Sequence, residues 1–339
     1  MAPVNRPGVP SGAVEADDVL AGKVIELSGI PMLLSASDHA RAEAVASLFR
    51  HARVTTAAPR CTLVFADDEL GLPETPPTVT VADARLWHAE SATLWIQSDE
   101  GLVARCDDRA IAICGDAPTP AREFRFVCLI ALTHLLARHG FHLLHGAAMV
   151  VAERTLLVLG GTGTGKSTLA FAAHTRGWPV LADDAVIVRH ADGVVHVSGL
   201  PRPISVGADV VVDAVGGGRP VPDDLRARTE LPPGTLVATT NPVATVVVMA
   251  GTDDRGSGID AMRGPDVLRA VLQASTSLAD STVRPELFAL AGALARLPAW
   301  SVRNRKDPSR ALDDATSRLD DLTRLLCASP VDPPGMTGS

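Results

Sequence analysis

The chain has 339 residues, of which 46% are hydrophobic and 21% are charged. This length and composition predict a globular protein with room for two domains of ordinary size. The net charge of −8 and the pI near 5.7 argue against nucleic acid or an anionic membrane as a partner. We find no signal peptide and no apolar run long enough to span a bilayer, so we expect a cytoplasmic location.

Composition and turn signals divide the chain into four parts. Residues 1–20 carry Pro, Gly and acidic residues without periodicity and predict a flexible lead, and residues 328–339 predict a flexible tail. Between them we expect a β-rich α+β accessory domain at 21–119 and an α/β domain at 120–327. The five cysteines show no metal-binding spacing, so we expect free thiols.

The sequence of the accessory domain consists of short apolar segments separated by residues that favour turns. One stretch, residues 39–51, has apolar residues at helical spacing and predicts a helix. The remaining segments are rich in β-branched and aromatic residues and predict strands at 60–66, 78–81, 91–97, 102–106 and 109–114. None of these segments carries a motif that implies chemistry.

From residue 120 onward, the sequence predicts helices and strands that alternate along the chain. A helix is expected at 121–138, ended by Gly140, and a second at 167–176, ended by Gly177. Strands are expected on both sides of the second helix, and the order strand, loop, helix, strand is an α/β unit. The predicted strands are 143–151, 155–159, 179–182, 185–190, 203–206 and 244–250, with a polar stretch at 216–234 and C-terminal helices at 265–296 and 308–326.

A phosphate-binding loop follows the predicted strand 155–159. The segment Gly160–Ser167 reads GGTGTGKS and matches GxxxxGK[ST] at every fixed position. Glycines let successive backbone N–H groups face one concave nest, to which the following helix adds its positive N-terminal end. Lys166 can reach the β- and γ-phosphates, and Ser167 can ligate Mg²⁺. The nucleotide-binding residues predicted here are Gly160, Gly161, Thr162, Gly163, Thr164, Gly165, Lys166, Ser167 and Thr168.

Two adjacent acids end the strand that follows the loop's helix. In enzymes with this loop, an acid at such a strand end is the usual second anchor for Mg²⁺. One carboxylate of Asp183 and Asp184 is then available for metal, while the other accepts a proton from an attacking hydroxyl. The alternative is that one of the two only caps a turn. His145, upstream in LLHGAA, is a third candidate; a core histidine that is simply hydrogen-bonded is its alternative.

The segment from Leu143 to Val188 resembles the catalytic core of HPr kinase/phosphorylase and its wider superfamily. In that family a His-Gly precedes the loop, and an Arg-Gly at the helix end precedes a strand that reaches an Asp-Asp pair. Here His145 lies 21 residues before Lys166, and Asp183 lies 17 residues after it. The resemblance implies an α/β P-loop kinase core, similar to HPr kinase and PEP carboxykinase.

The resemblance also implies roles. Asp183 would take the proton of the acceptor hydroxyl, Ser167 and Asp184 would serve the metal, and His145 would tune or orient the acidic pair. The family's IRGLG-type segment is replaced here by SGLPRPISVGADV, and the N-terminal domain differs too. HPr as substrate and a reverse phosphorylase activity are therefore not expected. The layout is closer to the HPr-kinase-like proteins of peptide and other natural-product pathways.

The resulting hypothesis is a kinase that uses ATP and Mg²⁺. Its acceptor would be a serine or threonine hydroxyl of a peptide or protein, or a small hydroxylated metabolite. Assembly into a homo-oligomer stays open. Two alternatives remain: a regulatory or accessory ATPase that transfers phosphate only to water, and carboxykinase-like chemistry on an oxyacid.

Overall fold

The computed structural model describes most of the chain. The described residues are 22–49, 52–81, 84–88, 92–115, 121–200, 205–207, 228–230, 239–252, 258–275, 284–304 and 311–328. The expected flexible lead at 1–20, the tail beyond residue 328 and most of the polar stretch 216–234 lie outside them. In the described part of the chain, no helix is both long and apolar enough to cross a membrane.

The N-terminal residues form a nine-stranded mixed sheet with the order β3-β1-β2-β4-β9-β8-β7-β6-β5. β2, β4 and β9 run parallel to one another, and the other neighbours are antiparallel. The strands are β1 (Val24–Leu27), β2 (Ile30–Ala36), β3 (Arg53–Thr55), β4 (Cys61–Ala66), β5 (Val79–Val81), β6 (Ala84–His88), β7 (Leu94–Ser98), β8 (Val103–Cys106) and β9 (Ala110–Cys114).

The sequence predicted five of these strands and missed β1, β2, β3 and β6. β7 was predicted correctly because its residues alternate between buried and half-buried positions, as expected for a strand with one face in the core. β2 was missed because its near-continuous apolar run has no clear period. The predicted helix at 39–51 is confirmed as α1 (His39–Phe49).

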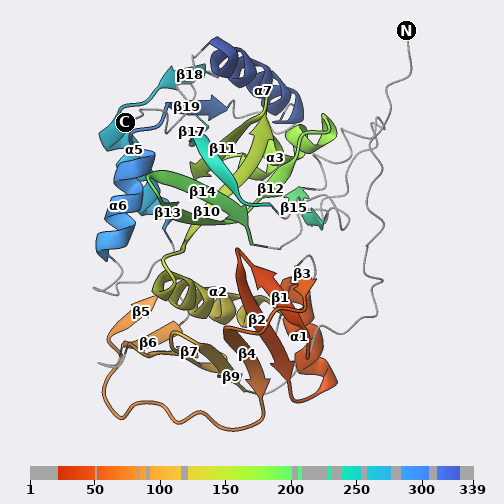
Figure 1. Cartoon of the computed structure of the whole chain (residues 1–339), viewed down its shortest axis with the longest axis vertical. Coiled ribbons are helices and arrows are strands. Elements are labelled where there is room, and N and C mark those ends of the chain that lie inside the picture. Colours follow the sequence, from red (N-terminus) through yellow and green to blue (C-terminus); the bar gives the residue numbers. More distant parts are fainter. Residues whose placement is uncertain are drawn as a thin grey trace.

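Helix α2 (Ala121–Arg138) lies between the two halves of the molecule (Figure 1). Its residues Phe124, Val127 and Leu135 are fully buried in one cluster with the N-terminal strands and α1. The same cluster includes Leu143 and Ile187 of the second half. The apolar core is therefore continuous across the junction, and the division at residues 119 and 120 stays a proposal.

The second half is built on β10 and β17, two long strands that each pair with different partners along their length. The first part of β10 pairs with β13, and its second part pairs with β11 and β12. β17 pairs with β14 at its start and then runs parallel to β11 and β19. The strands are β10 (His142–Val151), β11 (Arg154–Gly160), β12 (Val180–Ala182), β13 (Ala185–Ala191), β14 (Val194–Gly199), β17 (Asn241–Thr252), β18 (Gly258–Ala261) and β19 (Ala299–Asn304).

Two helix layers cover opposite faces of this sheet. Along β11, Leu157 and Leu159 pack with the helices on one side, whereas Leu156 and Val158 pack with those on the other. Because both faces are covered, four consecutive residues of β11, 156–159, are apolar and buried, as is typical of α/β folds. The first layer is α5 (Gly264–Ala274) and α6 (Arg284–Leu294), and the second is α3 (Lys166–Thr175) and α7 (Ala311–Ala328).

One predicted element was wrong. The sequence predicted a single helical region at 265–296, but the structure has two helices there. α5 ends where Ser275 takes an extended conformation and forms a bridge with Leu144 of β10. Apolar residues recur at helical spacing on both sides of this break, so the sequence pattern alone does not show that the helix ends there. The break depends on pairing with a strand about 130 residues earlier, which periodicity does not reveal. The strand expected at 203–206 is described only as β15 (Ser205–Gly207), which pairs with β16 (Arg228–Glu230).

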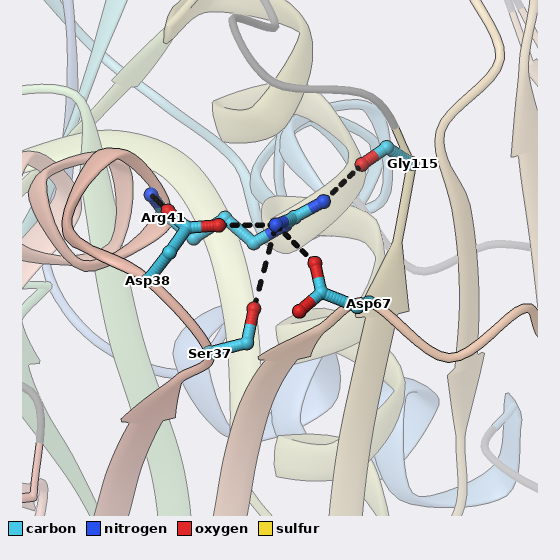
Figure 2. Close-up of polar contacts among 5 residues, drawn as sticks. All are labelled: Ser37, Asp38, Arg41, Asp67 and Gly115. Carbon is cyan, nitrogen blue, oxygen red and sulfur yellow. Dashed lines mark hydrogen bonds and ion pairs between the residues drawn. The ribbon is translucent and has the colours of Figure 1, made fainter.

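Arg41 holds together the carboxyl ends of the three parallel N-terminal strands (Figure 2). Its side chain is 11% exposed and forms ion pairs with Asp38, after β2, and Asp67, after β4. It also donates to the carbonyl oxygen of Gly115, after β9, at 2.9 Å. The Arg41 backbone N–H, followed by its guanidinium, lowers the pKa of Asp38 below the usual 3.8. The stabilisation from Asp38 is therefore complete above that value and is lost as the pH falls through the lower folded-state pKa.

We expect Arg41→Met to lower the free energy of unfolding by about 1–2 kcal/mol, because a mostly buried guanidinium with several hydrogen bonds is lost. Urea denaturation monitored by circular dichroism measures this change. The matched control is Arg85→Met, whose ion pair with Asp99 is exposed and 3.9 Å long. That control should change stability by less than about 0.5 kcal/mol, and equal effects of the two variants would contradict the role given to Arg41.

Candidate active site

The site is organised around β10, which carries His145 between two partners. On one side, Gly146 pairs with Leu159, so His145 lies next to the start of the phosphate loop at Gly160. On the other side, His145 pairs with Ala185, the residue that follows the acidic pair. Two strand pairings therefore bring together segments that are far apart in the sequence.

A two-residue turn sets the first of these pairings. Ala152 and Glu153 connect β10 to β11, and both have positive φ, at 48° and 62°. Such turns match the twist of the strands and fix the pairing register of a hairpin. Asn-Gly is the usual sequence signal for this turn, and Ala-Glu lacks it, so the sequence did not predict the register.

The phosphate loop takes backbone conformations that favour glycine at three of its four glycines. Gly160, Gly163 and Gly165 have φ values of 149°, 77° and 99°. The glycine-rich sequence also predicts such a conformation at Gly161, and for that residue the prediction is wrong. Gly161 does not have positive φ, and a Cβ there would meet only a methyl carbon of Thr164, at 3.8 Å. At Gly160, in contrast, a Cβ would lie 2.8 Å from the carbonyl oxygen of Met249 on β17.

These two neighbouring glycines form a matched pair for mutation. We expect Gly160→Ala to weaken ATP binding about tenfold or more, since both the backbone strain and the contact with β17 must be relieved by moving the loop. Gly161→Ala should keep ATP affinity within about threefold of wild type, because nothing in the loop opposes its methyl group. Isothermal titration calorimetry with Mg·ATP measures both, and a larger loss for Gly161→Ala would contradict the loop geometry.

The loop leads into α3, whose N-terminus has the properties of an anion site. The N-cap residue, Gly165, provides no side-chain hydrogen bond, and the first turn contains no acidic residue. The first N–H groups of a helix have no partner within the helix, and their dipoles give that end a partial positive charge. A phosphate group suits this position because it supplies both acceptors and negative charge.

Lys166 points back into the loop. Its side chain nitrogen lies 2.8 Å from the carbonyl oxygens of both Gly160 and Gly161, and 3.0 Å from Nε2 of His145. Three acceptors match the three N–H donors of an ammonium group. The residue is only 5% exposed, so water screens its charge little. The hydroxyl of Thr164 also donates to the carbonyl oxygen of Gly161, at 2.9 Å.

His145 connects Lys166 to the acidic pair. Since Nε2 accepts from the ammonium group, the ring proton must sit on Nδ1 in the neutral tautomer. Nδ1 lies 3.1 Å from the carbonyl oxygen of Asp184 and 3.2 Å from its carboxylate oxygen Oδ1. The sequence suggested His145 as a candidate, but nothing in the sequence indicated its contact with Lys166.

The acidic pair occupies a bend between β12 and β13. Asp183 is 4% exposed, whereas the side chain of Asp184 is 43% exposed. The backbone N–H of Gly146 donates to the carbonyl oxygen of Asp184 at 3.2 Å, which ties the bend to β10. The two carboxylates therefore have different environments, and the half-exposed one is in contact with His145.

The remaining predicted residues belong to the loop and the first turn of α3. Thr162 is exposed, and Ser167 and Thr168 are half-buried. The Ser167 hydroxyl and the Asp184 carboxylate are hard oxygen donors, which suit Mg²⁺. Mg²⁺ usually needs only one or two protein ligands, because water and phosphate oxygens provide the rest. Among the described residues there is no group of three or more His, Cys, Asp or Glu residues arranged to hold a metal.

Comparisons with known proteins add little to this geometry. No protein-family model matches the sequence, and no characterised protein matches it either. Among solved structures, the Hpr(Ser) kinase/phosphatase from Coxiella burnetii is similar over 54% of this chain and 98% of its own. The TM-score is 0.27 and the sequence identity is 13%. A likeness at this TM-score carries no functional conclusion for this chain.

Proposed function

We propose that the chain is an ATP-dependent phosphotransferase that acts on a hydroxyl group. The observation that carries the proposal is the phosphate loop: a GxxxxGK[ST] motif between a buried strand and a helix whose N-terminus has neither a side-chain cap nor an acid. Around it, Lys166, His145 and Asp184 form a continuous chain of polar contacts. The resemblance of this segment to HPr-kinase-like proteins supports the same reaction.

Each group has a defined task in this proposal. The loop amides and Lys166 bind the β- and γ-phosphates and stabilise the charge that develops during transfer. Ser167 and Asp184 hold Mg²⁺, which would neutralise phosphate charge when bound. Asp183 accepts the proton of the attacking hydroxyl, and its burial shields that step from water. His145 orients Asp184 through its Nδ1–H and contacts Lys166 through Nε2.

Phosphorus NMR tests this reaction against the accessory-ATPase alternative. The protein is incubated with ATP, Mg²⁺ and a panel of serine- and threonine-containing peptides and free hydroxy amino acids. The proposal expects ADP together with a new phosphomonoester resonance. ADP with only inorganic phosphate would favour the ATPase. Failure to bind Mg·ATP at all would overturn the assignment of the loop.

A further inference from the structure

The acidic pair lies in the bend just before β13, a strand whose two faces border different hydrophobic cores. Leu181 and Ala182, just before the pair, are buried in the cluster that contains α5 and α6. On β13, just after the pair, Val186 and Val188 are buried in that same cluster, whereas Ala185 and Ile187 are buried in the cluster formed by the N-terminal sheet and α2. The direction of the bend at 183–184 therefore depends on both cores.

The end of β14 holds this bend on both sides. Gly199 packs so closely against β12 that a Cβ there would overlap the carbonyl oxygen of Leu181 and lie 3.2 Å from the Cβ of Ala182. Its φ is not positive, so the reason for glycine is space and not conformation. On the other side of the pair, the N–H of Leu200 donates to the carbonyl oxygen of Ala185 at 3.1 Å.

The N-terminal sheet contacts this same end of β14. The turn between β1 and β2 places the Oγ of Ser28 2.6 Å from the Oγ of Ser198, which precedes Gly199. Ser198 is 7% exposed, and Ser28 has a positive φ of 52° within the tight turn. In Figure 1 the β1–β2 hairpin extends from the lower sheet toward the upper half of the molecule. A contact across 170 residues thus lies one residue from the glycine that supports the acidic pair.

We propose that the N-terminal sheet is a positioning element for the acidic pair, acting through Ser28, Ser198 and Gly199. The hairpin turn holds the end of β14, and β14 in turn sets the path of the backbone on both sides of Asp183 and Asp184. The N-terminal sheet then contributes to catalysis without contacting the nucleotide. This inference rests on the proposed phosphotransferase function.

The first test is Gly199→Ala, with Gly292→Ala on α6 as the matched control, because a Cβ at Gly292 meets nothing within 4 Å. We expect Gly199→Ala to lower kcat for ATP turnover at least tenfold while the Kd for Mg·ATP stays within about twofold of wild type. The control should leave both unchanged. A kcat within twofold of wild type in folded Gly199→Ala would overturn the proposal.

A second test decides whether the N-terminal sheet positions the acidic pair if Gly199→Ala does not fold. Ser28→Ala and Ser198→Ala should each lower kcat about threefold or more, and the double variant should be no slower than the slower single variant. Ser47→Ala is the control, because its hydroxyl donates to the carbonyl oxygen of Ala44 in its own helix. Additive losses, or no loss, would contradict a joint role of the two serines.

A structural readout separates this inference from the function on which it rests. The imidazole nitrogen signals of His145, identified with His145→Gln, report the contact between Nδ1 and Asp184. We expect Ser198→Ala and Gly199→Ala to shift these signals and Ser47→Ala and Gly292→Ala to leave them in place. If wild type turns over no ATP, the function fails, and these signals still decide whether the N-terminal sheet positions the pair. Unchanged signals in both test variants would overturn the positioning role.

Discussion

Lys166→Met should lower the rate of ATP turnover by about 10²- to 10³-fold. The ammonium group lies 2.8 Å from a loop carbonyl oxygen in a residue that is 5% exposed, and in the proposed reaction it would stabilise the transferred phosphoryl group with little screening. Methionine keeps a similar length and apolar stem but removes the charge and all three donors. A coupled assay for ADP release, at saturating Mg·ATP, measures the effect.

Two controls make this result specific. Lys23→Met removes the same charge from the start of the N-terminal sheet and should leave turnover unchanged. The melting temperature of each variant should be recorded, because Lys166 also links the loop to His145 and its loss is expected to loosen the loop. Turnover at the wild-type rate in a folded Lys166→Met protein would refute the role of the phosphate loop.

Asp183→Asn is expected to separate nucleotide binding from transfer. The amide has the same shape as the carboxylate and fits the same buried space, so the Kd for Mg·ATP should stay within about threefold of wild type. It cannot accept the proton of the attacking hydroxyl, and the rate of transfer should fall by about 10²- to 10⁴-fold. Calorimetry measures the binding, and phosphorus NMR measures the formation of the phosphomonoester.

The matched control for this change is Asp192→Asn. Asp192 is exposed in the turn between β13 and β14, with φ of 51°, a conformation that asparagine accepts readily. The same loss of charge there should leave transfer unchanged. If Asp183→Asn transfers phosphate at a near-normal rate while Asp184→Asn does not, then the half-exposed acid beside His145 is the base, and the assigned roles are reversed.

Local sequence patterns predicted those structural features that are determined by residues close together in the sequence. The helix ends at Gly140 and Gly177 are confirmed, with φ of 75° and 74°, because a left-handed terminus requires glycine whatever surrounds it. Five strands of the N-terminal sheet were also found from their own residues, among them β7 and β8, which alternate in burial. In contrast, β2 and the break between α5 and α6 depend on distant strands, and the period of their own residues does not reveal those partners.

The sequence by itself indicated a glycine-rich turn between a buried strand and a helix, and that turn is present with positive φ at Gly160, Gly163 and Gly165. It also determined which residues could serve as acids, bases and metal ligands there. Only the tertiary structure decided that His145 meets both Lys166 and Asp184, and that the end of β14 holds the acidic pair. Those contacts depend on strand register and on the joining of two cores, and both are set by pairings between segments 21 to 170 residues apart.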